Sequence, residues 1–217
     1  MWQVLSVQVG QVREMSGYAP KEQAQCSWRS ATRKEPALGP VRLTRLGFVG
    51  DEQADTKNHG GEEKAVLFFP AAHYPRWREE LPWIPFGPGG FGENLTVDCT
   101  EEDVAIGDVL AVGRAVVEIS QPRVPCWKQA WRWGVEDLVE RMQQTGRTGF
   151  YGRVLQAGEI QGGDTLTVLN RPHPEVTVAR LSRARYEHAP AEERRCLAGC
   201  AALAEDWRRW LLRHAGA

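Results

Sequence analysis

The sequence predicts a mostly β protein, an antiparallel barrel or sandwich, that carries a small helical module at its carboxy-terminal end. Up to about residue 170, short runs rich in β-branched residues alternate with turns that contain Gly, Pro and Asp. This spacing is typical of antiparallel strands. Beyond residues 170–176 the apolar residues instead follow the period of an α-helix. We therefore expect a β domain over residues 1–170 and a three-helix module over residues 174–217.

The expected strands follow the alternating runs directly. In chain order they cover residues 2–10, 64–69, 93–97, 108–113, 115–120 and 164–169. Two helices are expected between them. Over residues 135–146, apolar residues recur at the helical period and Gly146 provides a stop. Over residues 70–81, Pro70 can occupy a first helical turn, but Pro75 interrupts the pattern.

The carboxy-terminal module reads as three short amphipathic helices. They cover residues 177–188, 191–203 and 204–215. A bundle of this size is marginal alone, so we expect it to dock on the β domain. The last helix intersperses Trp and Leu with Arg, which a docked amphipathic helix explains at least as well as a DNA-recognition helix.

The composition restricts the functional classes. Among 217 residues, 27 Lys and Arg almost cancel 28 Asp and Glu, so a global field for nucleic acid or an anionic membrane is not expected. No run approaches the roughly 20 apolar residues of a membrane span, and the amino terminus lacks the pattern of a secretory signal. The five cysteines are irregularly spaced, without a disulfide framework or a CxxC pair. We expect a cytoplasmic protein.

The segment "SQPRVPCWK", residues 120–128, contains the side chain that most suggests chemistry. Its two prolines restrict the backbone and end the preceding strand. Arg123 and Lys128 place positive charge beside Cys126, which favours the thiolate. Thiolate is the form that binds a soft metal or attacks an electrophile. An ordinary half-buried cysteine is the competing interpretation, and the prolines and cations favour a functional one.

Two further segments have the composition of binding loops. In "GDEQADTKNHGGEEKAV", residues 50–66, a double glycine beside an imidazole can bring backbone amides close to an anion, although taken alone the segment is better explained as a polar turn before the next strand. In "PWIPFGPGGFGENLTV", residues 82–97, prolines, glycines and aromatic rings form a long irregular loop. This loop could wall a pocket for a flat heterocycle, with Glu93 and Asn94 reading its edges, or it could cap the open end of a barrel.

The fourth segment, "GRTGFYGRV" at residues 146–154, reads as a basic loop. Arg147 and Arg153 flank glycines and two aromatic residues, a plausible site for phosphate or carboxylate.

Taken in this order, the segments "GDEQAD-KNHGG-EKAV", "GGFGENLTV", "IGDVLAVG-AVVEISQPRVPCWK" and "TGFYGRVLQAGEIQGGD" resemble the MOSC domain family, and within it the YiiM-like branch. The resemblance runs from about residue 47 to 169, and residues 174–215 look like the three-helix module of that branch. One such segment would be weak evidence, whereas four in register are hard to obtain by chance. The resemblance implies a MOSC-type β-barrel that binds the molybdenum cofactor (molybdopterin), a pterin dithiolene that carries a phosphate.

The resemblance also implies the residues of the site. The cysteine with which the family coordinates molybdenum falls on Cys126, which is therefore our expected metal ligand and catalytic residue. The residues expected to bind the cofactor around it are Asn58, His59, Gly60, Gly61, Phe91, Glu93, Asn94, Arg123 and Arg147.

The activity implied by the resemblance is reduction. Members of the YiiM-like branch are implicated in reducing N-hydroxylated bases, so we expect a molybdenum-dependent reductase of small N-hydroxylated compounds such as N-hydroxylated purine bases. No iron–sulfur cysteine cluster and no dinucleotide glycine fingerprint appears in the sequence, so an external electron-donor reductase is expected as a partner. No membrane or nucleic-acid partner is expected, and the oligomeric state stays open, with a homodimer as one option.

Two other functions compete with this one. A sulfur-transfer or molybdenum-cofactor carrier protein would hold a persulfide on Cys126. A hydrolase would pair Cys126 with His59 and need an oxyanion hole. It ranks last, because no glycine-rich elbow lies beside Cys126.

Overall fold

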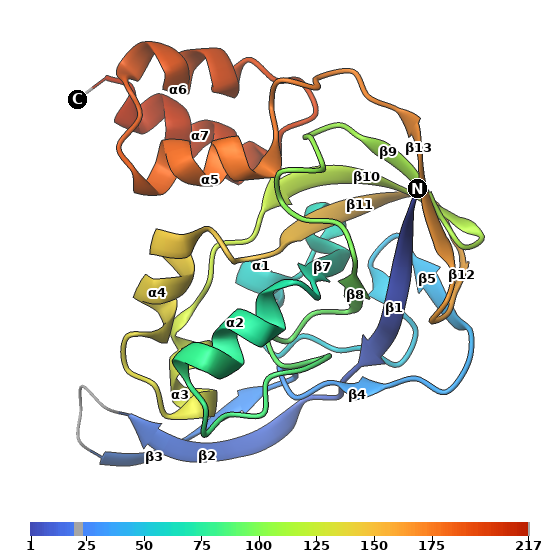
Figure 1. Cartoon of the computed structure of the whole chain (residues 1–217), viewed down its shortest axis with the longest axis vertical. Coiled ribbons are helices and arrows are strands. Elements are labelled where there is room, and N and C mark those ends of the chain that lie inside the picture. The colour runs from blue at the N-terminus through green and yellow to red at the C-terminus, as the bar shows by residue number, and fades with distance from the viewer. Residues whose placement is uncertain (20–23, 217) are drawn as a thin grey trace.

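In the computed structural model, which describes residues 1–19 and 24–216, seven strands close into a barrel (Figure 1). Residue 217, the end of the expected helical module, lies outside the described residues. Neighbouring strands are antiparallel except for β7 and β8, and β1 pairs with β13 to close the ring. In order around the barrel the strands are β13 (Thr165–Asn170), β9 (Val109–Val112), β10 (Ala115–Pro122), β11 (Phe150–Gln156), β7 (Val66–Pro70), β8 (Leu95–Val97) and β1 (Trp2–Val9).

Shorter strands surround the barrel. A hairpin of β2 with β3 extends away from it, a small sheet joins β12, β5 and β6, and β4 pairs with the end of β1. Their bounds are β2 (Arg13–Ala19), β3 (Ala24–Ser30), β4 (Glu35–Pro36), β5 (Val41–Thr44), β6 (Gly47–Phe48) and β12 (Gly158–Ile160).

The barrel interior is a continuous hydrophobic core. Strand residues that alternate inward, such as Val4, Leu110 and Val117, are fully buried. The rings of Phe68 and Phe150 stack across the interior with their centroids 5.1 Å apart. The mostly β barrel predicted from the sequence is confirmed.

A second core lies outside the barrel, under α2 (His73–Glu80), α3 (Trp127–Trp133) and α4 (Leu138–Thr145). The aromatic residues of the 82–97 loop fill it, because Phe86 and Phe91 stack on each other at 4.8 Å and are almost fully buried. The loop therefore packs as part of the core, and among its aromatic side chains only Trp83 remains largely exposed. Helix α2 starts later than Pro70, and Pro75 fits because it lies in the first turn, where the backbone N–H has no partner within the helix.

The carboxy-terminal module consists of α5 (Val178–Tyr186), α6 (Ala191–Ala198) and α7 (Glu205–His214), close to the expected positions (orange to red in Figure 1). Leu181, Leu197 and Trp207 belong to the same buried cluster as the barrel interior. The helices therefore dock on the barrel and share its core. In the part of the chain that is described, no helix combines the length and apolarity needed to cross a membrane.

The segment 146–154 differs from its prediction as a loop. Residues 150–154 form the first part of β11, which pairs with both β10 and β7. The glycines permit this close packing: a Cβ on Gly152 would lie 2.4 Å from Cγ1 of Val117, and one on Gly149 would lie 2.4 Å from the carbonyl oxygen of Phe68. Glycine here marks close approach between strands.

Candidate functional site

Cys126 lies where two cavities meet. Strand β10 ends at Pro122, and Cys126 then precedes the first residue of α3 in an extended conformation (φ −119°, ψ 163°). The side chain is half-buried. A smaller cavity lies on one side, bounded by the β7–β8 region and the 51–55 segment. A larger groove lies on the other side, between the barrel loops and α7.

Arg123 is held firmly in the wall of the smaller cavity. Its backbone N–H donates to the carbonyl of Gly149 at 3.0 Å, and its Nη2 donates to the carbonyl of Phe91 at 2.9 Å. Its Nη1 is buried and has no hydrogen-bond partner among the described residues. A buried guanidinium nitrogen without an acceptor is costly, so this side chain is suited to a ligand oxygen or nitrogen in the cavity.

Positive charge converges on the junction of the two cavities. His59, Lys64 and Lys128 all line both cavities together with Cys126. Burial lowers the pKa of His59, and the positive charges of Lys128, Arg123 and Lys64 lower it further against the opposing effect of Asp55. His59 is therefore neutral at pH 7, with one ring nitrogen able to donate and the other able to accept a hydrogen bond.

The far wall of the smaller cavity contains a buried ion pair. Lys34 pairs with Asp51, and their side chains are 7% and 2% exposed. Asp51 also accepts hydrogen bonds from the backbone N–H of Gly10 at 2.8 Å and from Nδ2 of Asn94 at 2.9 Å. Asn94 Oδ1 in turn accepts from the N–H of Leu67 at 3.2 Å. Asn94 thus lines the cavity, as expected, and also fixes the carboxylate of Asp51.

Phe91 and Glu93 shape the wall from behind. Phe91 borders the smaller cavity and provides the carbonyl that accepts from both Arg123 and Gln129. Glu93 is fully buried, and its carboxylate accepts hydrogen bonds from the N–H groups of Gly89 and Phe91 and from the hydroxyl of Tyr74. Its carboxylate oxygens accept hydrogen bonds from the protein, so Glu93 stabilises the loop and does not line the cavity.

The 56–61 segment contributes less than expected. Asn58 borders only the larger groove, where its side chain donates to Asp55 at 2.9 Å. Gly60 and Gly61 border neither cavity, within the residues that the structure describes. Gly61 has φ +91°, a conformation that favours glycine and turns the chain into the short helix η2 (Glu62–Lys64).

The two arginines of the 146–154 segment lie away from the cavities. Arg147 donates to Glu80 at 2.7 Å, and its guanidinium carbon lies 3.9 Å from the ring centroid of Trp77. Arg153 is paired with Glu118 and Glu63. Neither arginine borders the space beside Cys126, so the structure does not bring Arg147 together with the other predicted cofactor-binding residues.

Tyr151 and Gln129 are among the cavity residues that were not predicted from the sequence. Tyr151 of β11 borders both cavities, and burial raises the pKa of its phenol, so the hydroxyl stays protonated at neutral pH. Gln129 lies one helical turn after Cys126, and its Oε1 is buried without a donor among the described residues. Tyr151 lies in the motif "GFYGRV", but the arginines of this segment indicated a basic loop, so the sequence predicted no role for Tyr151.

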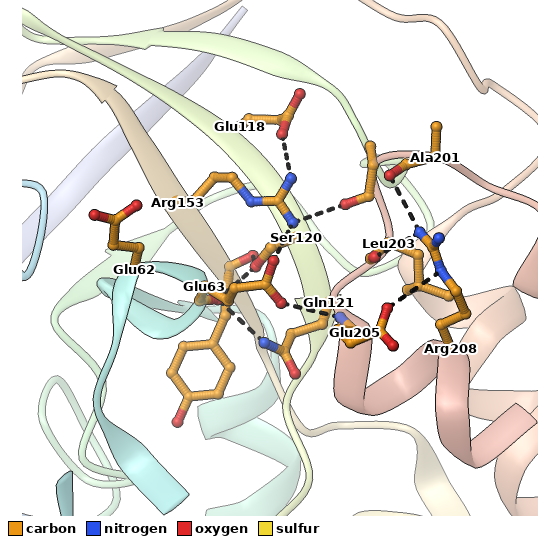
Figure 2. A network of polar contacts seen from close by, with 12 residues as sticks. Glu62, Glu63, Glu118, Ser120, Gln121, Arg153, Ala201, Leu203, Glu205 and Arg208 are labelled. Atoms are coloured by element: carbon orange, nitrogen blue, oxygen red, sulfur yellow. Dashed lines mark hydrogen bonds and ion pairs between the residues drawn. The ribbon is translucent and has the colours of Figure 1, made fainter. Parts of the chain in front are cut away.

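The C-terminal helices are tied to this site through Glu63 (Figure 2). The carbonyl of Glu63 accepts from Ser120 at 2.7 Å and Gln121 at 3.1 Å, both at the end of β10. Its carboxylate accepts from Arg153 at 2.9 Å and from the N–H of Glu205, at the start of α7, at 3.1 Å. One residue beside the cavity therefore connects η2, β10, β11 and α7.

Comparison with known proteins decides the family. The family model described as "MOSC domain" matches residues 55–167. The chain belongs to the MOSC domain family. It is 48% identical over 179 residues to the uncharacterized protein YflK of Bacillus subtilis, covering 81% of this chain and 80% of YflK. The crystal structure of YiiM from Geobacillus stearothermophilus superposes with a TM-score of 0.81 at 32% identity, covering 99% of this chain and 100% of that one.

A third MOSC relative is much longer. A protein of Gibberella moniliformis named "Reductase" is 42% identical over 158 residues, which are 71% of this chain and 28% of that protein. The YiiM-like assignment made from the four segments is confirmed. MOSC domains are associated with the molybdenum cofactor in general, so this chain is a molybdenum-cofactor-associated enzyme or binding protein.

Proposed function

We propose that the protein is a molybdenum-cofactor-dependent reductase of N-hydroxylated compounds, including N-hydroxylated purine bases. The observation that carries the proposal is the position of Cys126, a half-buried thiol at the junction of two cavities, among cations and beside a buried guanidinium nitrogen without a partner. A single protein thiolate suits a soft metal that brings other ligands with it.

The polar groups that line the smaller cavity are of the kinds that a pterin carrying a phosphate would bind. Arg123 Nη1 offers a donor, and Gln129 Oε1 offers an acceptor, to the polar edge of a heterocycle. Lys64 and Lys128 provide positive charge for the phosphate, and Cys126 would provide the thiolate ligand to molybdenum.

The bound cofactor would supply the two-electron redox chemistry of oxygen-atom removal. The overall reaction is R–NHOH + 2e⁻ + 2H⁺ → R–NH₂ + H₂O, in which the N–O bond breaks and its oxygen leaves as water. The chain must therefore deliver protons near Cys126. The neutral imidazole of His59 borders both cavities and can relay a proton, since one ring nitrogen accepts and the other donates, and the protonated hydroxyl of Tyr151 can donate a hydrogen bond beside it.

The electrons require a partner. Because most of the longer relative named "Reductase" lies outside its match to this chain, we propose that the MOSC unit works beside a separate electron-donating unit, here an external reductase protein.

The decisive experiment compares wild type with Cys126→Ala, both produced with molybdate in a host that makes the cofactor. Cys26→Ala is the matched control, since Cys26 is also a half-buried free cysteine but borders neither cavity. We expect near-stoichiometric molybdenum and pterin in wild type and control, a sharp loss of molybdenum in Cys126→Ala, and conversion of an N-hydroxylated purine to its amine with a chemical reductant. Equal molybdenum in all three proteins would contradict the role of Cys126.

The same samples separate the carrier alternative from the reductase. Intact mass is measured before and after treatment with a thiol reductant. A wild-type protein without molybdenum or pterin, whose mass falls by one sulfur on reduction, would overturn the reductase in favour of a persulfide carrier.

A further inference from the structure

The larger groove has its own chemistry, distinct from that of the smaller cavity. It has a volume of about 960 Å³ between the 124–128 segment and the C-terminal helices, and it opens directly onto Cys126. Pockets for small ligands commonly enclose ~300–1,000 Å³. If the smaller cavity holds a cofactor on one side of Cys126, the groove is the space left for a substrate on the other side.

The groove is positively charged, although the whole chain has a net charge of −1. Its lining contains two aspartates, Asp55 and Asp206, against five cations. The cations are Lys64, Lys128, Arg185, Arg209 and Arg213. An excess of one sign within a concave surface attracts ligands of the opposite sign.

Three of these cations are not neutralised by the protein. Lys64 pairs with Asp206 at 3.6 Å, and Arg209 pairs with Glu205 at 2.8 Å. Among the residues that the structure describes, no carboxylate lies within ion-pair distance of Lys128, Arg185 or Arg213, which border the groove from three different elements. A group of free cations that face one space is the arrangement used to bind phosphate or carboxylate.

Arg185 is held in place by aromatic rings. Its guanidinium carbon lies 4.4 Å from the ring centroid of Trp210 and 5.0 Å from that of Trp207. Trp207 is buried and fixed to the end of β10, because its Nε1 donates to the carbonyl of Pro122 at 3.0 Å. The cation is therefore oriented by the fold before any ligand arrives, which reduces the entropy lost on binding.

The groove also presents an exposed aromatic surface. Trp127 follows Cys126 directly and is 46% exposed, and Val124 and Leu212 are 40% and 51% exposed at the same groove. Planar heterocycles stack on such an indole, and stacking of a nucleobase on an aromatic side chain contributes ~1–3 kcal/mol.

We propose that this groove holds the substrate, and that the substrate is a purine-like base that carries a phosphate group, a nucleotide. The base stacks beside Trp127 next to Cys126, and the phosphate binds Arg185 and Arg213, the free cations that border only the groove. The C-terminal helices thereby form the substrate wall. This inference rests on the proposed function for the reacting N–O group, and it deepens that function by naming the class of substrate.

The test is isothermal titration of the cofactor-loaded protein with adenosine monophosphate, adenosine and inorganic phosphate. These probes lack an N–O bond, so they bind without turnover. We expect the nucleotide to bind at least about 10-fold more tightly than adenosine, as a charge-assisted phosphate contact predicts. We also expect inorganic phosphate to bind more weakly than the nucleotide, and the nucleotide affinity to fall as salt rises.

Variants locate the binding to the groove. Arg213→Gln, at an exposed residue that borders only the groove, and Arg185→Gln should each weaken nucleotide binding about 10-fold and leave adenosine unchanged. Arg114→Gln is the matched control, because Arg114 is 82% exposed on its side chain and borders neither cavity.

Three results would overturn the inference. Equal affinities for nucleotide and adenosine would remove the phosphate site, and equal affinities for nucleotide and inorganic phosphate would remove the base site. If the nucleotide does not bind but an acidic flavodoxin does, and Arg213→Gln abolishes the binding of the flavodoxin, the groove is a docking surface for a protein. Molybdenum measured on the same sample separates the two proposals. Nucleotide binding without molybdenum contradicts only the proposed function, and molybdenum without nucleotide binding contradicts only the substrate.

Discussion

Replacing Trp207 by Phe tests whether the C-terminal helices stabilise the site. Trp207 is 1% exposed, and its Nε1 donates to the carbonyl of Pro122, four residues before Cys126. The substitution leaves that buried carbonyl without a donor, which costs about 1–3 kcal/mol. The smaller ring leaves a void that costs on the order of 1 kcal/mol more.

The expected loss in the free energy of unfolding is therefore about 2–4 kcal/mol. For a chain of this size it lowers the thermal midpoint by roughly 4–16 °C. Urea denaturation measures the free energy, and differential scanning calorimetry measures the midpoint. Trp83→Phe is the matched control, because Trp83 is 70% exposed and should change stability by less than about 0.5 kcal/mol.

A second measurement follows the effect into the site. Without the bond to Pro122, the turn that carries Cys126 opens more often, so a disulfide reagent should modify Cys126 faster in Trp207→Phe than in wild type or Trp83→Phe. Mass spectrometry of the peptide that contains Cys126 measures the rate at which this thiol is modified, separately from the modification of the exposed Cys196. A loss of stability no larger than that of the control, with an unchanged rate, would refute this view of the helices.

Three further predictions concern the barrel and the smaller cavity. Arg123→Met should lower the pterin retained on purification by about 10-fold or more, because it removes a charged donor, and equal pterin would contradict this. Gly152→Ala should destabilise the barrel by about 1–3 kcal/mol in urea, because its Cβ would lie 2.4 Å from a neighbouring methyl group, and an unchanged midpoint would contradict it. Burial lowers the pKa of Lys34 in the folded protein below its ordinary value of 10.5, despite the opposing effect of Asp51. Between the folded and the unfolded pKa of Lys34 the unfolded chain binds more protons, so the stability of the wild type rises with pH in that range. Denaturation from pH 7 to 10 should show a smaller rise in Lys34→Met/Asp51→Asn, and identical slopes would contradict the burial argument.

The sequence predicted the elements whose packing repeats locally. Strands β1, β9 and β10 carry an alternation of inward and outward residues that is visible without the fold. Strand β11 lacked that signal, because two of the residues that touch other strands are Gly149 and Gly152, and glycine resembles a loop residue when its neighbours are unknown. Its close contacts come from Phe68 and Val117, which are far away in sequence.

The site, like the fold, was predictable where its residues are close in sequence and not where they are brought together by distant segments. Cys126 and Arg123 lie three positions apart in the chain, so their common environment was visible as a motif. The position of Arg147 away from both cavities was not visible, because its partner Glu80 lies 67 positions away and no local pattern shows this pairing. Tyr151 was missed, because the direction of a strand side chain depends on register, which only the pairing with neighbouring strands fixes.

The barrel and the C-terminal helices fold as one unit at the boundary between them. The helices share the buried cluster of the barrel, and Glu63 and Trp207 attach α7 to the end of β10. A module built only to bind a separate partner would not need a shared core. The same attachments bring Arg185 and Arg213 opposite Cys126 across one groove, and ligand sites lie preferentially at such seams between structural units. Separating the helices from the barrel would therefore remove the helical wall of the groove together with the hydrogen bond that anchors the turn before Cys126.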